Sequence, residues 1–441
     1  MAIFVVNGGT TLSGEYVLSG AKNAAPKLLI ASLLSDQTCT FHNISRFSDT
    51  FRSIEAITAL GGSVRFTDRN SVEVNCADMF GNEIPVDAMS ARQSVLFIGA
   101  TLARQGYVKI FSPKGDSIGK RPLNRHLDGI VALGGKIIDR GSYMEISMPK
   151  RPRPTVYTFE KTTHCGTENL ILASVFNLGK VVLKNAAQEP EVDNLIETLN
   201  GMGASVKRVS PRVVEVVGVE PLLHGTETTS VYDRLEAATA ITLSIMNGGR
   251  ITVIHTPHEL VTEFIKFCEE IGVRFRWNGD KLSITNIKKP LNTANITTSW
   301  EPGFMTDWQP LAGLLLATLS RGRSSIHERI YESRWKYLRE LAKMGVKYEL
   351  FQPDGYDAKF YNFNDSEFKP EDYYGAYVYG PTELKPTTVQ SHDVRAGIDM
   401  LIAALSANGE STIMDPSNHI DRGYENIVEK LIKCGASIVR M

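Results

Sequence analysis

The sequence predicts an α/β fold made of six copies of one unit, arranged as two domains of three units each. Two sequence patterns alternate along the 441 residues. The first is a helix end that runs into glycine and then a short β-rich stretch. The second is an apolar helix that ends at a small or polar turn before another strand. Alternating recurrence of this kind is typical of a repeated supersecondary unit.

The first pattern places a glycine at the end of six helices. In each copy the glycine supplies the left-handed cap that ends a helix before a strand. The intervals between successive glycines are 73, 69, 69, 73 and 90 residues. The last interval is longer because it contains residues 351–379, which we interpret as a surface insertion, decorative rather than catalytic. The six glycines are Gly61, Gly134, Gly203, Gly272, Gly345 and Gly435.

The second pattern predicts six apolar helices that alternate with the first set. We expect them at 28–36, 95–106, 170–179, 238–249, 311–322 and 398–409. Three such units give a domain of about 200 residues, within the usual range. We therefore predict one domain at 22–230, which carries a mobile loop at 112–123, and a second domain at 1–21 plus 231–441. The N-terminal strand at 4–7 fits either domain by pattern alone. We expect the active site in the cleft between the domains.

Charge and cysteine content exclude several classes of function. The chain has 48 Lys and Arg against 49 Asp and Glu, so no overall field draws it to nucleic acid or a membrane surface. Its five cysteines lack metal or redox spacing, and its first residues lack a signal pattern, so we expect a reduced cytoplasmic compartment. No apolar run approaches the roughly 20 residues of a membrane span. We expect no metal, no cofactor and no obligate protein partner.

Charged or hydrogen-bonding residues open all six apolar helices. Because a helix N-terminus carries unsatisfied N–H groups, it binds phosphates and carboxylates readily. The three aspartates in this set could act as ordinary N-caps. The cations oppose the helix dipole, which indicates an anion bound between them. The opening residues are Lys22-Asn23, Arg92, Thr167-Glu168-Asn169, Asp233-Arg234, Asp307 and Asp393-Arg395.

The stretch 115–122 is typical of a loop over a phosphate. It combines two glycines, one carboxylate, two cations and a proline. A carboxylate beside a bound anion is unfavourable unless it arrives protonated and gives that proton away. We therefore interpret Asp116 as a candidate general acid. The alternative is a surface turn capped by an aspartate.

If the six units are arranged alike, their helix starts face one cleft. Several cations there suit a substrate with phosphate and carboxylate groups, and two separated carboxylates suit a general acid and a general base. The sequence lacks a P-loop, a dinucleotide-binding glycine motif, a His-rich metal cluster and a nucleophile elbow. We therefore predict anion-assisted acid/base chemistry. The cleft would contain Lys22, Arg92, Arg121, Arg395 and Arg422 beside Asp116, Asp233, Asp307 and Glu189.

A set of motifs in this order resembles the UDP-N-acetylglucosamine 1-carboxyvinyltransferase family, the enolpyruvyl transferases that begin peptidoglycan synthesis. The resemblance covers essentially the whole chain. It implies a pair of inside-out α/β domains, each of three similar units, that close over substrate. The motifs are 14–25, 115–122 with 126–127, 185–191, 232–236, 302–307, 392–396 and 419–425.

The resemblance implies transfer of the enolpyruvyl group of phosphoenolpyruvate to a sugar hydroxyl, with release of phosphate. It implies that Lys22, Arg121 and Arg422 hold phosphoenolpyruvate, and that Arg92 and Arg395 complete the anion site. Asn23 would contact the sugar near the reacting hydroxyl, and Asp307 would be the base. The remaining expected substrate-binding residues are Thr163, His164, Glu189, Asp233 and Asp393.

This chain departs from the family pattern at four places. Asp116 stands where most members carry cysteine. Fosfomycin alkylates that thiol and a carboxylate is a weaker nucleophile, so we predict resistance to the drug. Thr163-His164-Cys165 stands where the family usually has Ser-Val-Gly, Asn124-Arg125 replaces the common Asp-Leu, and Ser48 replaces a frequent lysine. These three changes lie in the nucleotide region. His164 either discriminates acceptors or is a satisfied loop histidine.

Four other functions stay open. Another uridine nucleotide, such as UMP in a nucleoside-antibiotic pathway, could be the acceptor. Shikimate enolpyruvyl transfer uses the same fold, but the motifs at 22–23 and 419–425 fit the sugar-nucleotide branch better. RNA 3′-terminal phosphate cyclase is built from related units but should show a basic surface. A non-catalytic sugar-nucleotide sensor would leave Asp116 and Asp307 unexplained.

Overall fold

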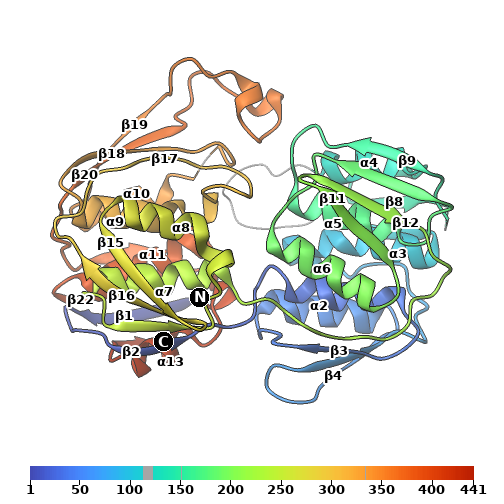
Figure 1. The fold of residues 1–441 in the computed structure, drawn as a ribbon, viewed down its shortest axis with the longest axis horizontal. Coiled ribbons are helices and arrows are strands. Elements are labelled where there is room, and N and C mark those ends of the chain that lie inside the picture. The colour runs from blue at the N-terminus through green and yellow to red at the C-terminus, as the bar shows by residue number, and fades with distance from the viewer. Residues whose placement is uncertain (113–122, 150, 333) are drawn as a thin grey trace. The chain divides into compact units, whose positions relative to one another are not determined.

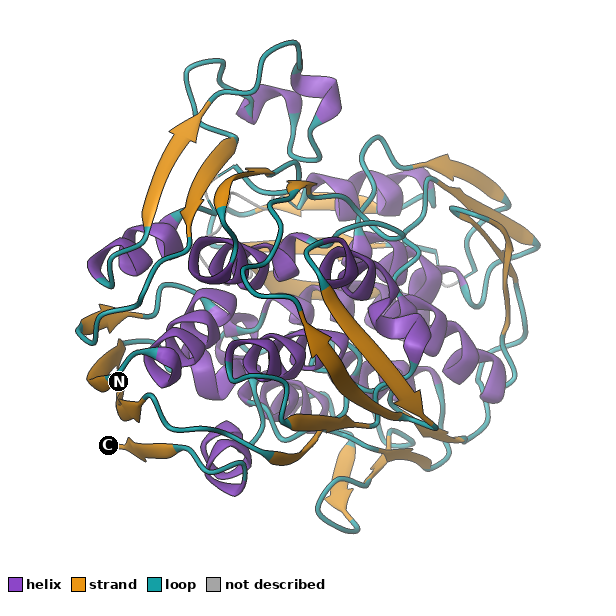
Figure 2. Ribbon diagram, turned by 60° about the vertical axis from the view of Figure 1, so that its left-hand side comes forward, coloured by secondary structure: helices purple, strands orange, loops and turns teal. Residues whose placement is uncertain are grey.

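The computed structural model describes residues 1–112, 123–149, 151–332 and 334–441. These residues form two compact units, whose elements are drawn in Figures 1 and 2. The C-terminal unit comprises Met1–Leu18 and Tyr232–Met441, and the N-terminal unit comprises the described residues from Ser19 to Val231. The chain therefore passes from one unit to the other after Leu18 and again after Val231.

The described part of the C-terminal unit contains three four-stranded sheets. In each sheet one edge pair is parallel and the other neighbours are antiparallel. The first sheet runs β15 (Val273–Asn278), β16 (Lys281–Ile287), β14 (Ile251–Ile254) and β2 (Gly14–Val17). The second runs β17 (Asn295–Thr297), β18 (Gly322–His327), β20 (Gly375–Gly380) and β19 (Lys347–Phe351). The third runs β21 (Thr388–Gln390), β22 (Gly409–Asp415), β1 (Ala2–Gly8) and β23 (Ser437–Arg440).

The described part of the N-terminal unit repeats this plan. One sheet runs β13 (Glu227–Thr229), β3 (Cys39–His42), β5 (Val72–Asn75) and β4 (Ser63–Phe66). Another runs β11 (Ser205–Ser210), β12 (Val213–Val217), β10 (Lys180–Lys184) and β9 (Thr155–Thr158). The last runs β6 (Tyr107–Phe111), β8 (Tyr143–Ser147) and β7 (Lys136–Asp139), and a single parallel bridge from Glu83 to Lys109 takes the place of its fourth strand.

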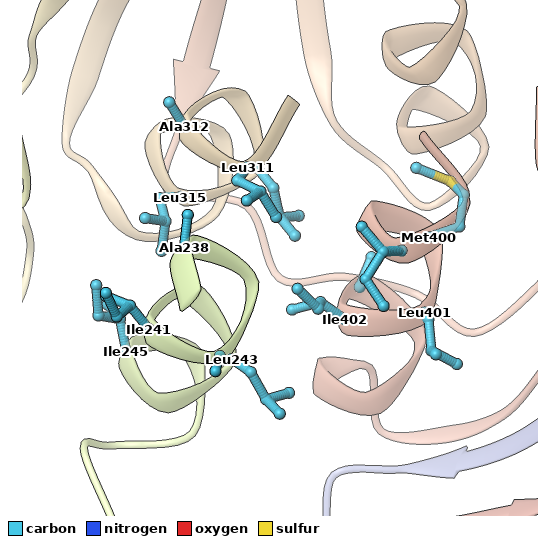
Figure 3. Close-up of a cluster of buried hydrophobic side chains, with 14 of the residues drawn as sticks. Ala238, Ile241, Leu243, Ile245, Leu311, Ala312, Leu315, Met400, Leu401 and Ile402 are labelled. Atoms are coloured by element: carbon cyan, nitrogen blue, oxygen red, sulfur yellow. The ribbon is translucent and has the colours of Figure 1, made fainter. Parts of the chain in front are cut away.

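One helix of each unit copy is buried almost all round. In the C-terminal unit these helices are α7 (Arg234–Met246), α9 (Gln309–Leu319) and α11 (Val394–Ser406), and they pack on one another. Figure 3 shows their apolar side chains meeting in the interior of the unit. Their counterparts in the N-terminal unit are α1 (Ala25–Ala31), α3 (Phe97–Gln105) and α5 (His164–Ser174). A helix that is apolar on every side must be enclosed by protein, so the sheets and remaining helices surround these six.

The other main helices are amphipathic and each ends at a glycine. They are α2 (Ser48–Ala59), α4 (Asn124–Ala132), α6 (Pro190–Gly201), α8 (His258–Glu270), α10 (Lys336–Lys343) and α13 (Ile427–Lys433). All six predicted glycines have positive φ, between 94° and 107°. Side chains are disfavoured at such angles, and glycine alone ends the helix there without strain. The predicted glycine caps, and the α/β fold of repeated units, are confirmed.

Two strands pair in one unit while the chain next to them continues in the other. β2 pairs with β14 in the C-terminal unit, yet the chain continues from β2 into α1 of the N-terminal unit. β13 pairs with β3 in the N-terminal unit and then leads into α7 of the C-terminal unit. The N-terminal strand, which fitted either domain by sequence pattern, is β1 and lies between β22 and β23.

The insertion is shorter than the sequence predicted. β19 extends to Phe351 and β20 begins at Gly375, so the predicted insertion at 351–379 is corrected to 352–374. The outer residues of the predicted insertion belong to β19 and β20, in which Phe351 pairs with Gly375. The insertion contains the short 3₁₀ helices η5 (Ala358–Phe360) and η6 (Asp365–Glu367).

Candidate active site

Two of the predicted site residues cap central helices of the C-terminal unit. The Asp233 carboxylate accepts hydrogen bonds from the backbone N–H groups of Leu235 and Glu236, at 2.8 and 3.0 Å, at the start of α7. The Asp393 carboxylate accepts from Arg395 and Ala396, at 2.8 and 3.0 Å, at the start of α11. Both aspartates are therefore helix N-caps.

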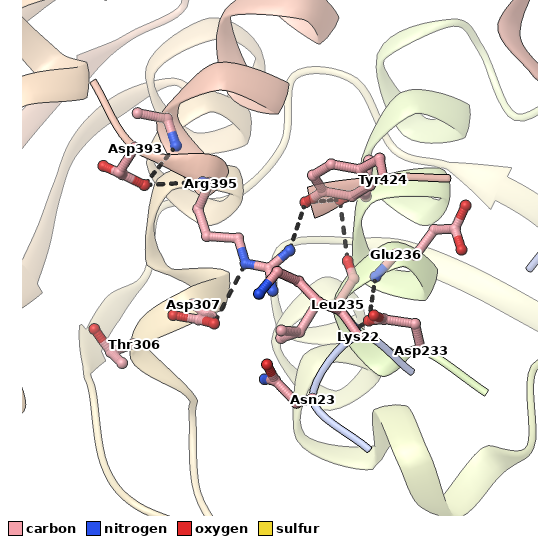
Figure 4. Close-up of polar contacts among 12 residues, drawn as sticks. Lys22, Asn23, Asp233, Leu235, Glu236, Thr306, Asp307, Asp393, Arg395 and Tyr424 are labelled. Carbon is pink, nitrogen blue, oxygen red and sulfur yellow. Dashed lines mark hydrogen bonds and ion pairs between the residues drawn. The ribbon is translucent and has the colours of Figure 1, made fainter. Parts of the chain in front are cut away.

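Asp307 is bound by two arginines instead of capping a helix. It lies in the 3₁₀ helix η4 (Thr306–Trp308) that precedes α9. Its Oδ1 is 2.7 Å from Arg334 Nη1, and its Oδ2 is 3.3 Å from Arg395 Nε. Figure 4 shows Arg395 reaching from the first turn of α11 to Asp307. The N-cap alternative is therefore wrong for Asp307.

The two arginines keep Asp307 ionised. Burial raises the pKa of this carboxyl, but Arg334 and Arg395 outweigh burial and hold the pKa well below its ordinary value. The Asp307 side chain is still 22% exposed, whereas the two arginine side chains are almost fully buried. Asp307 is thus a fixed, partly exposed anion, and its basicity depends on how closely the arginines hold it.

Arg395 has a second contact, with a tyrosine that the sequence motif contains. Its Nη1 donates to Tyr424 Oη at 3.1 Å (Figure 4). The Tyr424 and Thr239 hydroxyls are 3.1 Å apart. Arg422, expected to hold phosphoenolpyruvate, lies on the short helix α12 (His419–Gly423), which packs on α11. Arg395, Arg422 and Asp307 therefore come from neighbouring elements of one unit.

Lys22 and Asn23 are held in the N-terminal unit just before α1. Lys22 Nζ pairs with Asp49 Oδ2 at 2.5 Å, and Lys22 is only 8% exposed. Asn23 Oδ1 accepts a hydrogen bond from Gln93 Nε2 at 3.0 Å. The cation at this helix start therefore has a carboxylate partner in its own unit, which the sequence analysis did not anticipate.

Arg92 opens the 3₁₀ helix η3 (Arg92–Leu96) that leads into α3. It lies near His126, whose Nδ1 is 3.2 Å from Asn169 Nδ2. Burial lowers the pKa of His126 to about 3, and Arg92 and Arg125 add to the shift. His126 is thus a neutral core histidine at physiological pH.

The start of α5 lies one turn earlier than the sequence predicted. Thr163 is the N-cap, and its hydroxyl accepts from the Gly166 N–H at 3.2 Å. The residues expected to open this helix, 167–169, are fully buried in its second turn, so that expectation is wrong. They are polar because they have internal partners: the Thr167 hydroxyl accepts from the Ala187 N–H, and Asn169 accepts from the Gly99 N–H.

His164 is the first residue of α5, not a loop residue, and belongs to a charged cluster. Its Nε2 is 2.7 Å from Lys27 Nζ and 3.2 Å from Glu168 Oε1, and Lys27 pairs with Glu168 at 2.5 Å. Burial and Lys27 lower the pKa of His164, but Glu168 and Glu189 outweigh them, so the pKa lies above its ordinary value. Glu189 comes from the position before α6.

Asp116 and Arg121 lie outside the described residues, together with most of the predicted loop at 112–123. Arg334 is the residue that the sequence analysis missed. It lies between β18 and α10, outside every recurring pattern, and no spacing signal marks it.

The comparisons with known proteins decide the family. A model of the EPSP synthase (3-phosphoshikimate 1-carboxyvinyltransferase) family matches residues 6–431. The UDP-N-acetylglucosamine 1-carboxyvinyltransferase of Acinetobacter baylyi is 32% identical to this chain over 99% of both sequences. The UDP-N-acetylglucosamine 1-carboxyvinyltransferase 1 of Symbiobacterium thermophilum is 35% identical, over 99% of this chain and 95% of its own length. The chain belongs to the UDP-N-acetylglucosamine 1-carboxyvinyltransferase family. It is an enolpyruvyl transferase, as the sequence motifs predicted.

Solved structures show the same fold as this transferase. The enolpyruvyl transferase NikO from Streptomyces tendae superposes with a TM-score of 0.86 at 21% identity, over 100% of this chain and 99% of NikO. EPSP synthase from Acinetobacter baumannii gives a TM-score of 0.73 at 13% identity, over 100% of this chain and 99% of that chain. At these identities the likeness shows the fold alone, and it agrees with the six repeated units described above.

The described residues of the transferase hold no group of three or more His, Cys, Asp and Glu side chains placed to bind a metal ion. Within those residues, no helix has the length and apolar character needed to cross a bilayer.

Proposed function

We propose that this transferase moves the enolpyruvyl group of phosphoenolpyruvate to the 3-hydroxyl of UDP-N-acetylglucosamine and releases phosphate. The observation that carries the proposal is full-length identity of 32% and 35% to relatives named for that acceptor. The ionised Asp307 beside Arg395 supports it, because the reaction needs a base near cations that bind anions. The product would enter peptidoglycan synthesis.

In the proposed reaction Asp116 is the acid and Asp307 is the base. Asp116 protonates the methylene carbon of phosphoenolpyruvate, which leaves an oxocarbenium-like centre at the neighbouring carbon. The acceptor hydroxyl attacks that carbon, and its proton passes to Asp307. The Asp116 carboxylate then takes a proton back from the new methyl group as phosphate leaves, which forms the enolpyruvyl ether. Acid and base therefore act on different sides of the reacting carbon.

The ion pairs with Arg334 and Arg395 keep Asp307 ionised but also make it a weak base. A carboxylate bound to two guanidinium groups is a weak base because both cations stabilise its charge. In the proposed complex the anionic groups of phosphoenolpyruvate draw Arg395 toward themselves, which raises the pKa of Asp307. Substrate binding would thus prepare the base for the attacking hydroxyl.

The remaining site residues keep the roles that the family resemblance implies. Lys22, Arg121 and Arg422 would hold phosphoenolpyruvate, with Arg92 and Arg395 completing the anion site. Asn23 would contact the sugar. The other residues proposed to bind the acceptor nucleotide are Thr163, His164, Glu189, Asp233 and Asp393.

Phosphate release from phosphoenolpyruvate tests the acceptor. We expect turnover with UDP-N-acetylglucosamine and none with UMP or shikimate 3-phosphate. Turnover with UMP alone would overturn the cell-wall assignment, and absence of turnover with every acceptor would favour a sugar-nucleotide sensor.

Asp116→Asn should abolish turnover while nucleotide binding stays nearly intact; normal activity in this variant would remove Asp116 from the proton-donor role.

Another uridine nucleotide as acceptor is the second candidate. The cluster of Lys27, His164 and Glu168 favours it, because His164 lies in the stretch where the family usually has Ser-Val-Gly and joins these two charged side chains. A different set of charges at that position would suit a different nucleotide. The same acceptor panel separates the two candidates.

Fosfomycin provides a test that does not depend on the acceptor. The drug inactivates family members by alkylating the loop cysteine, and a carboxylate attacks its epoxide far more slowly than a thiolate. We predict that incubation with fosfomycin leaves activity unchanged over hours and gives no mass increase on the protein. Asp116→Cys should gain both time-dependent loss of activity and a drug adduct on that residue. An adduct on Asp116 of the unmodified protein would contradict the prediction.

A further inference from the structure

The segment 352–374 has no counterpart in the other units. In four other sheets the matching antiparallel strands are joined by short turns, at 67–71, 140–142, 211–212 and 279–280. Here the connection from β19 to β20 forms an aromatic cluster of its own, in which Tyr361, Phe363 and Tyr374 are buried and Phe360 and Phe368 pack against them. Figure 1 shows this segment in orange beyond the ends of β19 and β20. A buried cluster of this size implies an ordered element.

The insertion is hydrogen-bonded to the segment that follows β18, of which the structure describes residues 328–332 and 334–335. Arg329 is the centre of this contact: its Nε and Nη2 donate to the Phe360 carbonyl at 3.1 and 2.9 Å. Its guanidinium also lies 3.8 Å from the centroid of the Phe360 ring, a cation–π distance. The Asn362 N–H returns a hydrogen bond to the Arg329 carbonyl at 2.7 Å. Arg329 is thus held on three sides by one short helix and the residues after it.

Three further bonds join the same two segments. His327 Nε2 and Tyr361 Oη share a hydrogen bond of 3.1 Å. The Glu328 N–H donates to the Tyr374 carbonyl at 2.8 Å, and Trp335 Nε1 donates to the Tyr373 carbonyl at 2.8 Å. The insertion therefore contacts the segment after β18 at its beginning and at its end.

The segment held in this way carries the side chains that hold Asp307 and its neighbour. Arg334 Nη1 donates to the Thr306 hydroxyl at 2.8 Å and lies 2.7 Å from Asp307 Oδ1. The Thr306 hydroxyl in turn donates to Glu328 Oε2 at 3.0 Å. Glu328 is fully buried, and its other oxygen accepts the backbone N–H groups of Ile330 and Tyr331. The positions of Arg334 and Glu328, which contact η4, thus depend on the geometry of one irregular segment.

We propose that the insertion 352–374 is a positioning element that fixes the segment after β18, so that Arg334 and Glu328 hold Thr306 and Asp307 in place. An irregular segment has no ladder of backbone hydrogen bonds to hold it, and catalytic geometry tolerates little displacement. The insertion supplies the missing bonds from one side. The proposal deepens the proposed function, because it takes Asp307 as the base.

Arg329→Met tests the contact between the insertion and the segment after β18, which we call the clamp, and Arg323→Met is the matched control. The first change removes two hydrogen bonds and the cation–π contacts with Phe360 and Trp300 but keeps an apolar stem. Arg323 lies at the other end of β18, with its guanidinium 4.3 Å from the centroid of the Tyr377 ring, and takes no part in the clamp. We expect kcat to fall about tenfold in Arg329→Met, with KM for both substrates within about twofold of the wild-type value. Arg323→Met should leave both constants unchanged.

Hydrogen exchange of 303–308 gives a second reading that needs no turnover. We expect faster exchange there, in 328–332 and in 352–374 in Arg329→Met than in the wild type or in Arg323→Met, with exchange in the rest of the C-terminal unit unchanged. Arg329→Lys should restore most of kcat, because lysine keeps a donor for the Phe360 carbonyl and a charge over its ring. Trp335→Phe, which removes one bond at the other end of the segment, should show a weaker form of the same two effects.

Wild-type kcat and exchange in Arg329→Met would overturn the proposal. So would a loss that Arg329→Lys does not rescue, or faster exchange throughout the unit, since either would show that the insertion only stabilises the fold. Absence of turnover in the wild type would instead refute the proposed function, and the exchange comparison would still decide whether the clamp exists.

Discussion

Asp307 is held by two arginines of different origin. Arg395 belongs to the first turn of α11, a buried helix, and its guanidinium is shared with Tyr424. Arg334 comes from an irregular segment. Arg395, which lies on the buried helix, is the arginine that we propose to turn from Asp307 toward bound substrate. Arg334, which lies on the irregular segment, makes the shorter ion pair with Asp307. The charge of Asp307 therefore contributes to stability as well as to the proposed catalysis.

Asp307→Asn should destabilise the C-terminal unit in a pH-dependent way. The folded pKa of Asp307 lies below its unfolded value, so the charge contributes stability above about pH 4, and this contribution is lost as pH falls through the folded pKa. We expect the variant to lower the free energy of unfolding by about 2 kcal/mol at pH 7, because two buried guanidinium groups lose their anion. Urea unfolding at pH 7 and pH 3 measures the difference, which should shrink at pH 3.

Asp421→Asn is the control for that experiment. Asp421 pairs with Arg440 at 2.5 Å, but both side chains are more than a third exposed. Solvent screens such a pair, so its removal should change the free energy of unfolding by less than about 0.5 kcal/mol. If the Asp307 and Asp421 variants lose equal amounts of stability, the Asp307 ion pairs contribute no more than surface pairs.

At the residue scale the sequence located charges but not their partners. Lys22 and Arg395 stand out because cations oppose the dipole at a helix start. Their carboxylate partners, Asp49 and Asp307, lie 27 and 88 residues away in the chain. No local spacing predicts a pair that only the packing of distant elements brings together. Arg334 was missed for the same reason.

At the scale of the elements, local rules predicted the helix ends better than the helix starts. A glycine at positive φ ends a helix by its own backbone chemistry, so all six caps could be predicted. The start of α5 could not, because a polar run marks either a helix start or a buried network. Glu168 and Asn169 belong to the second class, since each is fully buried with partners on other elements.

Helix α11 contains a buried carboxyl group, that of Asp399, whose protonation state the sequence patterns could not predict. Asp399 is fully buried, and neither of its oxygens has a hydrogen-bond partner among the described residues. Burial raises the pKa of this carboxyl well above its ordinary value, and the charge of Asp393 raises it further. Asp399 is therefore neutral over a wide pH range, and ionising it costs folding free energy.

Asp399→Asn should make the protein more stable at high pH. The folded pKa of Asp399 lies above the unfolded one, so the wild type loses stability as pH rises from the unfolded pKa toward the folded pKa. An asparagine removes that loss because it cannot ionise. We expect the free energy of unfolding of the variant to exceed that of the wild type by about 1 kcal/mol or more at pH 8, and by less at pH 5. Urea unfolding at the two pH values provides the measurement.

Asp415→Asn should show the opposite behaviour and is the matched control. Asp415 is also fully buried, on β22, but it accepts the backbone N–H groups of His419 and Ile420, at 2.8 and 2.9 Å. These bonds and His419 outweigh burial and lower the pKa of Asp415. Its charge is therefore stabilising at neutral pH, and the variant should be less stable than the wild type. Equal pH dependence in the two variants would contradict the assignment of a neutral Asp399.

On the scale of the whole molecule, the chain order and the compact units do not coincide. The C-terminal unit takes its first strands from the beginning of the chain, and β1 lies inside its third sheet, between β22 and β23. The two chain ends meet there: the Ile3 N–H donates to the Met441 carbonyl at 3.0 Å, and the Met441 N–H donates to the Ile3 carbonyl at 2.8 Å. A sequence pattern predicts where strands lie along the chain, but the choice of sheet for β1 is made by tertiary pairing.

This topology predicts which fragments fold alone. Residues 232–441 lack β1 and β2, whose side chains Phe4, Val6 and Tyr16 are buried in the core of the C-terminal unit. Each contributes about 1.5–3 kcal/mol by burial, and the loss of β1 also leaves β22 and β23 without their shared neighbour. Residues 232–441 alone should therefore lack a cooperative urea transition. Joining Met441 through Asn-Gly to residues 1–18 should restore one, because Met441 already pairs with Ile3 and the fusion closes a four-residue hairpin loop between them. The same fusion with Phe4→Asp should stay unfolded, and a cooperative transition in residues 232–441 alone would show that the unit does not need the strands it takes from the start of the chain.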